Sequence, residues 1–480
     1  MARADLPFTF ARDQKMVLQG DALVCGPGAT VFGLREARRR AGGPLRVERV
    51  PEDAFETVLN AHYRDGAGNG EENDLSFDLE VQGGPGLRDL LEDATEAPVI
   101  ELVNQLLRRT VRGGASDLHV EPYEDGLRAR VRIDGMLRTV MDRSDVPVRR
   151  VISRLKVMAG LDTAETRLPQ DGRIGLRYGG RDIDVRMSTL PGHFGERITL
   201  RVLDRHSGLL PLDQLGLTDG QAEVLHRLAA RPDGIVLATG PTGSGKTTTL
   251  YSLLQLADQH KRNIVTVEDP IEYHLPGISQ TQTNAEIGMT FAAGLRATLR
   301  QDPDVILVGE IRDVETAQVA AQASLTGHLV FSSLHANGSV AAVTRLRDLG
   351  LDNFLIAATL RGILAQRLLR RLCDACKTLA SPDPVAAAMF DGIDAPLPLQ
   401  IARATGCETC GNTGYAGRQG VYEIVEITED VAAAIGENAS EQALKQIAVP
   451  RGNTLLAQGL HLVATGRTTI DEVRRVLGEG

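Results

Sequence analysis

The chain has 480 residues and a formal net charge of −10 at pH 7. This length accommodates about three domains, each with its own core. The acidic balance argues against non-specific binding to nucleic acid or to an anionic membrane. The N-terminus lacks a basic stretch followed by an apolar segment, so no signal peptide is expected, and no apolar run approaches the ~18–20 residues of a membrane span. We therefore expect a cytoplasmic protein that reaches a membrane only through its partners.

The first part of the chain has the pattern of a small separate domain. Helical patterns occur at 32–40 and 51–59, within a segment that covers 1–65. A polar, acidic and glycine-rich stretch follows and predicts a flexible linker over 66–84. Such a linker allows the first domain to swing.

The middle of the chain mixes helical and strand patterns. An amphipathic helix is predicted from about Ala97, and residues 127–133 and 181–187 alternate at period two, as half-buried antiparallel strands do. These patterns predict an α+β domain over 85–205. A second connection, with serine, glycine and proline, is expected over 206–218.

Strands and helices alternate in the last part of the chain. Apolar runs at 234–239, 263–268, 304–309 and 328–333 are separated by segments of helix length. This order predicts a mostly parallel sheet covered by helices, in a domain over 219–480.

A glycine-rich motif follows the first of these apolar runs. Residues 240–247 read Gly-Pro-Thr-Gly-Ser-Gly-Lys-Thr, which is a complete P-loop pattern between a predicted strand and a predicted helix. Glycines let such a loop curl so that backbone N–H groups point at phosphate oxygens. Lys246 is expected to reach the β- and γ-phosphates, and the Thr247 hydroxyl to hold Mg²⁺. The predicted ATP-binding residues are Gly240, Pro241, Thr242, Gly243, Ser244, Gly245, Lys246, Thr247 and Thr248.

Acidic residues end two of the predicted strands. Ligands of parallel sheets bind at the carboxyl ends of the strands. The apolar run 305–308 is followed by Gly309, where many P-loop enzymes have an aspartate, and then by Glu310. We expect Glu310 either to orient the attacking water or to hold a magnesium-bound water. The acids of the segment 268–272, including Glu268, are expected to place water or Mg²⁺.

Histidines and arginines add further candidates. His328 and His335 flank an apolar strand, so one of them is a candidate sensor of the γ-phosphate, with a structural role as the alternative. Arg296 and Arg300 stand four residues apart on one helical face. This pair fits a phosphate clamp better than a surface ion-pair ladder, because an ATPase must stabilise the charge of the transferred phosphoryl group.

Four of the five cysteines form two CxxC pairs. Cys25 stands alone and is expected to be an ordinary thiol, whereas the pairs are Cys373 with Cys376 and Cys407 with Cys410. Four thiolates in this arrangement satisfy tetrahedral Zn²⁺, and a closed site of this kind is structural rather than catalytic. We therefore predict a zinc subdomain over 373–417, with redox chemistry as the alternative.

The chain resembles the type II secretion traffic ATPases of bacteria, the E proteins (GspE family) of that pathway. The resemblance runs from about Leu6 to the C-terminus. It is densest in Ala-Ser-Asp-Leu-His-Val-Glu-Pro at 115–122, Arg-Leu-Pro-Gln-Asp-Gly-Arg at 167–173, Val-Glu-Asp-Pro-Ile-Glu-Tyr at 267–273, Gly-Met-Thr-Phe at 288–291, Arg-Gln-Asp-Pro-Asp at 300–304, Gly-Glu-Ile-Arg-Asp at 309–313 and Ala-Ser-Leu-Thr-Gly-His at 323–328.

This resemblance implies roles for particular residues. It places 268–272 in the aspartate box, 309–310 in an atypical Walker B motif, and His328 and His335 in the histidine box. One departure is Ala336, where the family usually has threonine. The phosphate-site arginines that the resemblance implies are Arg173 and Arg186 from the middle domain and Arg296 and Arg300 from the motor domain.

The resemblance also implies an architecture and an assembly. The expected fold is α/β: a RecA-like P-loop ATPase domain, a preceding α+β (PAS-like) domain, a small N-terminal domain and a tetracysteine zinc subdomain. Homohexameric rings at the cytoplasmic face of the inner membrane are implied. The N-terminal domain is expected to dock on the cytoplasmic domain of an inner-membrane platform protein, with a polytopic platform protein as a further partner. The cofactors are ATP, Mg²⁺ and Zn²⁺.

The function that follows is an ATPase motor that drives pseudopilus assembly and protein export across the outer membrane. A type IV pilus extension ATPase shares all these motifs, although the single short N-terminal domain is more similar to the secretion branch. A nucleic-acid translocase needs a basic channel with aromatic side chains, for which this acidic, aromatic-poor chain shows no pattern. A non-catalytic scaffold would lack the P-loop or Glu310, and both are present.

Overall fold

The computed structural model describes residues 6, 10–11, 14–19, 22–41, 45–51, 54–55, 58, 80–82, 97–179, 181–204, 210–393 and 395–478. The chain divides into two compact units, Met1–Glu80 with Arg177–Gly180, and Val81–Leu176 with Arg181–Gly480. The predicted linker 66–84 lies outside the described residues except for 80–82, and so do 206–209 of the second predicted connection and most of the helical pattern 51–59. In the described ranges, no helix combines the length and the apolarity that crossing a bilayer requires.

The first unit contains a small sheet with one helix. Its strands are β1 (Met16–Gln19), β2 (Ala22–Cys25) and β3 (Arg46–Arg49), in the order β1-β2-β3. The helix α2 (Val31–Ala41) covers the helical pattern predicted at 32–40 and connects β2 to β3, which run parallel. Met16, Leu23 and Phe55 are buried in its core.

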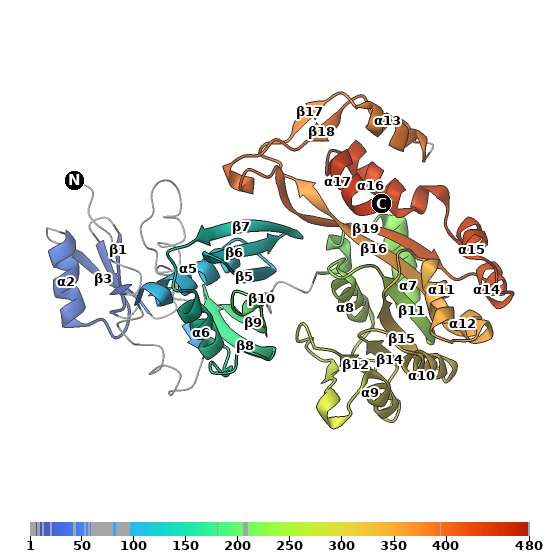
Figure 1. The fold of residues 1–480 in the computed structure, drawn as a ribbon, viewed down its shortest axis with the longest axis horizontal. Coiled ribbons are helices and arrows are strands. Elements are labelled where there is room, and N and C mark those ends of the chain that lie inside the picture. Colours follow the sequence, from blue (N-terminus) through green and yellow to red (C-terminus); the bar gives the residue numbers. More distant parts are fainter. Residues whose placement is uncertain are drawn as a thin grey trace. The chain divides into compact units, whose positions relative to one another are not determined.

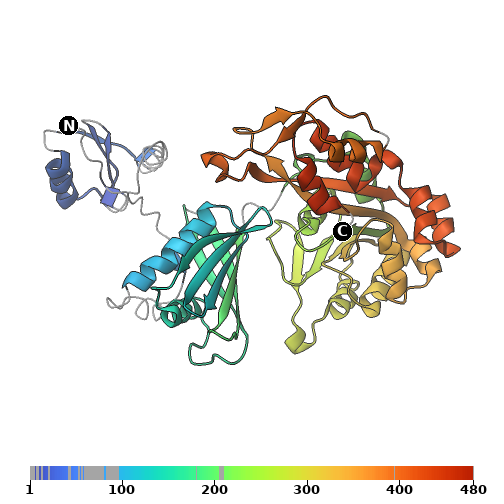
Figure 2. The same ribbon diagram turned by 45° about the horizontal axis from the view of Figure 1, so that its top comes forward.

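An antiparallel sheet with two helices opens the second unit. Its order is β8-β9-β10-β5-β6-β7, with the short β4 (Glu80–Gln82) at the β8 edge. The bounds are α5 (Ala97–Arg112), β5 (Asp117–Tyr123), β6 (Gly126–Ile133), β7 (Met136–Arg143), α6 (Val148–Met158), β8 (Gln170–Tyr178), β9 (Arg181–Leu190) and β10 (Arg197–Asp204). Alternate residues of β9 are buried, whereas the first four residues of β5 are all buried. The helices α5 and α6 lie together on one side of the sheet (Figure 1, Figure 2). The predicted helix from Ala97 and both predicted strands are therefore present.

A seven-stranded sheet forms the rest of the unit, in the order β13-β12-β14-β15-β11-β16-β19. All neighbours are parallel except β16 and β19, which are antiparallel. The strands are β11 (Gly234–Thr239), β12 (Ile264–Glu268), β13 (Ser279–Gln282), β14 (Val305–Val308), β15 (Leu329–Leu334), β16 (Leu360–Leu372) and β19 (Tyr415–Glu426). The four apolar runs of the sequence match β11, β12, β14 and β15 to within one residue at each end.

Helices cover both faces of this sheet (Figure 1). Val236 and Ala238 of β11 point into a core with α7 (Asp219–Ala229) and α8 (Lys246–Leu256). Ile235 and Leu237 point into the opposite core. That second core includes residues of α9 (Phe291–Thr298), α10 (Val314–Leu325), α11 (Ala341–Asp348), α12 (Asn353–Thr359), α14 (Glu429–Gly436) and α15 (Glu441–Ala448). Because both faces are buried, the strands are continuous apolar runs rather than alternating ones.

The C-terminal part packs on the far end of β16. It contains β17 (Thr378–Ala380), α13 (Pro384–Asp391), β18 (Ile401–Arg403), α16 (Leu455–Ala464) and α17 (Ile470–Leu477), with 3-10 turns at Glu408–Cys410 and Arg451–Asn453. Two further 3-10 turns lie earlier in the chain, Leu212–Gln214 before α7 and Ala285–Ile287 before α9. Glu472 of α17 is fully buried and accepts hydrogen bonds from Arg370 of β16 and from Arg475. Burial by itself raises the pKa of Glu472, but these arginines outweigh it and lower the pKa to about 2.

We predict that Glu472→Gln loosens α17, because two arginines would lose their counter-charge, at a cost of roughly 3 kcal/mol. The folded-state pKa lies below the ordinary 4.5, so the contribution of this carboxylate is complete above pH 4.5 and is lost as the pH falls toward about 2. Hydrogen exchange of the α17 amides measures the change, with the exposed Glu437→Gln as control. Unchanged exchange in Glu472→Gln would show that the ion pairs do not hold this helix.

Candidate functional site

The glycine-rich loop occupies the carboxyl end of the central strand β11. Gly240, Gly243 and Gly245 have φ of 146°, 78° and 89°, in the region that favours glycine. A Cβ at Gly240 would lie 2.6 Å from the Gln366 carbonyl oxygen, and one at Gly245 would lie 2.8 Å from the side-chain nitrogen of Gln366. The loop leads directly into α8, so backbone N–H groups and the helix N-terminus create an anion site at this edge.

Lys246 lies at the start of α8 and turns back onto the loop. Its ammonium donates hydrogen bonds to the Gly240 oxygen at 2.8 Å and the Pro241 oxygen at 3.1 Å. Burial lowers the pKa of Lys246, the charge of Glu310 opposes this shift, and the charge of Arg367 adds to it. The two carbonyl partners are neutral, so phosphate oxygens can replace them favourably. Thr247 and Thr248 follow in the first turn and are half-buried.

Glu310 lies at the same edge of the sheet. Val308 pairs with Ser332, and Thr239 pairs with Leu334, so β14, β15 and β11 end side by side. The Glu310 side chain is 14% exposed and forms an ion pair with Arg312, which raises the pKa of the arginine. His335 Nε2 lies 3.5 Å from a Glu310 oxygen. The structure thus brings Glu310, His335 and the loop to one edge, as a water-orienting role requires.

Glu268 is also close to this edge, but its carboxylate is buried and engaged. It accepts hydrogen bonds from the Tyr251 hydroxyl, from Thr266 Oγ1 at 2.6 Å and from Gln280 Nε2 at 3.1 Å. Burial raises the pKa of Tyr251, which therefore stays protonated and donates. This environment suits a carboxylate that holds the end of β12 in place.

An arginine of the antiparallel sheet reaches the segment after β12. Arg186 of β9 donates to the Ile271 oxygen at 2.9 Å, and its Nη1 lies 3.6 Å from Glu272. Burial raises the pKa of Glu272, whereas the charges of Arg186 and Arg201 lower it. Arg201 was missed in the sequence, although it pairs with Arg186 across β9 and β10. Arg173 of β8 is exposed, and among the described residues no hydrogen bond or ion pair joins it to the seven-stranded sheet.

Arg296 and Arg300 are exposed at the end of α9. Arg296 forms an ion pair with Glu315 at 2.6 Å, and Arg300 donates to the Arg296 oxygen at 2.9 Å. Within the chain they form a surface cluster, and no described contact joins them to the P-loop.

His328 is not brought to the P-loop of its own chain. It precedes β15, where Leu329 pairs with Gly234 at the start of β11, whereas the P-loop follows the end of β11. Its Nδ1 lies 2.9 Å from the Ala323 oxygen. The two histidines flank one strand and therefore lie at opposite edges of the sheet, so the expectation for a γ-phosphate sensor fits His335 alone.

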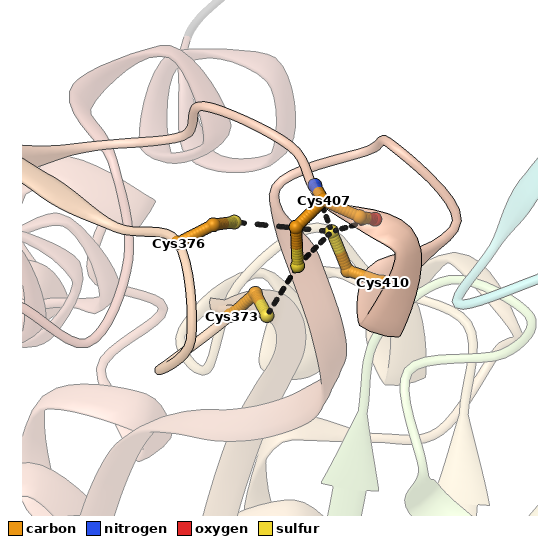
Figure 3. A group of neighbouring side chains, drawn as sticks. All are labelled: Cys373, Cys376, Cys407 and Cys410. Carbon is orange, nitrogen blue, oxygen red and sulfur yellow. Dashed lines mark hydrogen bonds between the residues drawn. The ribbon is translucent and has the colours of Figure 1, made fainter. Parts of the chain in front are cut away.

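The four paired cysteines converge at the far end of β16 and β19 (Figure 3). Their sulfur atoms all lie within 4.8 Å of one another, with separations of 3.9, 3.9 and 3.8 Å for Cys373–Cys407, Cys376–Cys410 and Cys407–Cys410. Four sulfurs at the usual Zn–S distance have separations of about 3.8 Å in a tetrahedron. The donor set and its spacing therefore fit a tetrahedral metal ion.

Hydrogen bonds prepare this cluster for a positive ion. The backbone N–H groups of Cys407 and Gly414 both donate to Cys410 Sγ at 3.2 Å. Burial opposes ionisation of Cys410, but these hydrogen bonds outweigh it and lower the pKa of the thiol to about 6. Cys25, by contrast, is buried in the other unit, and burial raises the pKa of its thiol.

In this mostly parallel sheet, a glycine-rich loop joins β11 to α8, and Glu310 follows β14, two strands away from β11. These features define a P-loop nucleoside triphosphatase. Residues 92–475 match the family described as Type II/IV secretion system protein, and residues 5–63 match an N-terminal domain described for GSPII protein E. The chain belongs to this family, in its type II secretion E branch, and is an ATP-hydrolysing enzyme. The α/β P-loop fold with an N-terminal domain, predicted from the sequence, is confirmed.

Named relatives are similar over almost the whole chain. The type II secretion system protein E of Pectobacterium carotovorum subsp. carotovorum is 48% identical over 99% of this chain and 98% of that protein. The protein E of Pseudomonas aeruginosa is 46% identical over 99% and 96%. The type II secretion system ATPase E of Vibrio cholerae is 45% identical over 99% and 97%.

Solved structures show the same fold. The pilus retraction motor PilT with bound ADP aligns with a TM-score of 0.53 and 27% identity, over 77% of this chain and 95% of that one. The ATPase DotB of Legionella pneumophila aligns with a TM-score of 0.57 and 21% identity, over 78% and 95%, and supports the fold alone.

Proposed function

We propose that the chain is the motor of a type II secretion system, in which ATP hydrolysis drives pseudopilus assembly and protein export across the outer membrane. The observation that carries this proposal is an intact P-loop and Glu310 in a chain whose relatives, matched over 99% of its length, are named type II secretion protein E. The match of residues 5–63 to the GSPII protein E domain favours this branch over the type IV pilus extension motor.

Within the nucleotide site, the residues take distinct roles. Residues 240–248 hold the phosphates, with Lys246 neutralising the β- and γ-phosphates. Thr247 holds Mg²⁺, which neutralises phosphate charge when bound. Glu310 orients the attacking water. His335, at the end of the neighbouring strand, contacts the Glu310 carboxylate. Glu268 supports this edge from within the fold.

The assembly proposed is a homohexamer at the cytoplasmic face of the inner membrane. The domain over 1–65 docks on the cytoplasmic domain of an inner-membrane platform protein, and a polytopic platform protein receives the force. The α+β domain (85–205) and the ATPase domain (219–480) are proposed to change position relative to each other during turnover. Arg186 and Arg173 then act at the phosphates when the α+β domain closes, and Arg296 and Arg300 when subunits meet.

The cysteine cluster is proposed to hold a structural Zn²⁺ ion through Cys373, Cys376, Cys407 and Cys410. Four protein ligands leave no open position, so the metal would stabilise the subdomain over 373–417 and take no part in hydrolysis.

Lys246→Ala should abolish ATP turnover, because it removes the charge that holds the terminal phosphates, and Glu310→Gln should bind ATP without hydrolysing it. Nucleotide binding and phosphate release by the purified full chain measure both effects. Lys261→Ala, whose side chain is 82% exposed and pairs with Asp258, is the matched control.

The same variants test the secretion role in cells. In a strain without the wild-type gene, neither Lys246→Ala nor Glu310→Gln should restore protein export. Export that continues in the absence of this chain, together with a loss of pili, would favour the pilus motor. Wild-type turnover in Glu310→Gln would remove that residue from its role.

Arg186→Ala should keep ATP affinity but slow hydrolysis, since an arginine that closes over the γ-phosphate is worth ~10³–10⁵ in rate. Residues 213–480 alone should behave in the same way. Turnover is compared at matched nucleotide occupancy and protein concentration. The variant Arg173→Ala, measured in the same way, distinguishes the contribution of Arg173 from that of Arg186. If Arg186 only pairs with Glu272 within the fold and never meets the phosphates, the rates will be equal.

Cys407→Ser or Cys410→Ser should lose zinc and local order over 373–417, while ATP affinity stays close to wild type because the P-loop follows β11 and the cluster lies beyond the far end of β16. Elemental analysis of protein purified without chelator measures the metal. Cys25→Ser is the matched control, since that cysteine lies outside the cluster. Less than about half a zinc ion per wild-type chain would rule out the site.

A further inference from the structure

The strand β16 extends beyond the edge of the sheet at which the P-loop lies. Thr239, the last residue of β11, pairs with Ala365. The next two residues of β16, Gln366 and Arg367, therefore flank the loop rather than the strand. Gln366 is buried and accepts a hydrogen bond from Thr249 of α8 at 2.8 Å. Adjacent residues of a strand point to opposite faces, which directs Arg367 away from α8.

The Arg367 guanidinium joins three segments around the loop. It donates to the Gln366 oxygen at 3.0 Å and to the Asn337 oxygen at 3.1 Å. A Cβ on Gly240 would lie 3.1 Å from Arg367 Nη1, so the guanidinium touches the first residue of the P-loop. Asn337 belongs to the segment that follows β15 and His335.

The charge of Arg367 is not neutralised by a hydrogen-bonded carboxylate in the described part of the chain; the partners found for it are backbone oxygens. The nearby carboxylate of Glu423 accepts from the Ser339 backbone N–H and hydroxyl. Burial lowers the pKa of Arg367, and the charge of Arg367 in turn lowers the pKa of Lys246. Lys246 and Arg367 are two partly buried cations that repel each other, which is unfavourable without an anion. A ligand with several negative charges offsets both the repulsion and the cost of burial.

We infer that Arg367 is a phosphate-binding residue of the nucleotide site and that it favours ATP over ADP. The inference rests on the proposed nucleotide site. Arg367 exchanges a backbone carbonyl for phosphate oxygens when ATP binds, with the paired N–H groups that suit a phosphate. Its positive charge adds to that of Lys246, so the benefit grows with the negative charge of the ligand.

Binding of ATP and ADP to the full chain tests this role, measured by competition against a fluorescent ATP analogue. Arg367→Ala should weaken ATP binding by about 10- to 100-fold and ADP binding by less, as expected for the loss of a hydrogen bond between charged groups. The ATP affinity of Arg367→Lys should lie between those of Arg367→Ala and the wild type. Lysine keeps the positive charge but lacks the paired N–H donors of the guanidinium. Arg371→Ala, on the same strand with a side chain 43% exposed, should not differ from the wild type.

Three results would overturn the inference. The first is wild-type affinity for ATP in Arg367→Ala. The second is an equal loss for ATP and ADP together with a lower unfolding temperature, which would make Arg367 a structural clamp. The third concerns Arg367→Gln, which keeps a donor but no charge and is used if Arg367→Ala does not fold. A wild-type preference for ATP over ADP in Arg367→Gln would overturn the inference. If instead the wild type does not bind ATP, or Lys246→Ala binds it equally well, the proposed site itself fails.

Discussion

Parallel strands all end at the same edge of a sheet, and the candidate chemistry of this protein depends on that constraint. β11 delivers the P-loop, β14 delivers Glu310 and β15 delivers His335 to one line. None of these groups is close to another in sequence. Their proximity follows from the strand order and register. Apolar side chains packed on both faces of the sheet stabilise that arrangement.

The charged side chains at this edge are of two kinds: some have their charge compensated by partners within the fold, and others do not. Glu268 is surrounded by donors of the fold, so its charge is already satisfied. Lys246 and Arg367, in contrast, contact backbone oxygens, which neutralise no charge. The site is therefore prepared for an anion. Because buried charge is costly when it is unpaired, the nucleotide proposed to bind here would offset that electrostatic cost.

A single strand connects the nucleotide site to the cysteine cluster. β16 passes the P-loop at Gln366 and ends at Leu372, immediately before Cys373. Arg370, between them, holds the buried Glu472 of α17 and lies 4.0 Å from the Tyr415 ring. The cluster thus lies at the end of a strand whose middle, at Gln366, lies against the P-loop.

Local spacing in the sequence was sufficient for the P-loop, the two CxxC pairs and the buried strands, because neighbouring residues carry each of those patterns. It was not sufficient for the roles of individual polar residues. Only the tertiary structure separates His328 from His335, buries the Glu268 carboxylate, and brings Arg201 near Glu272 and Arg367 to the P-loop. Which edge a residue occupies, and which side chains lie across from it, depends on strand order and register. These are set by contacts between residues far apart in the chain, which periodicity and motif spacing do not encode.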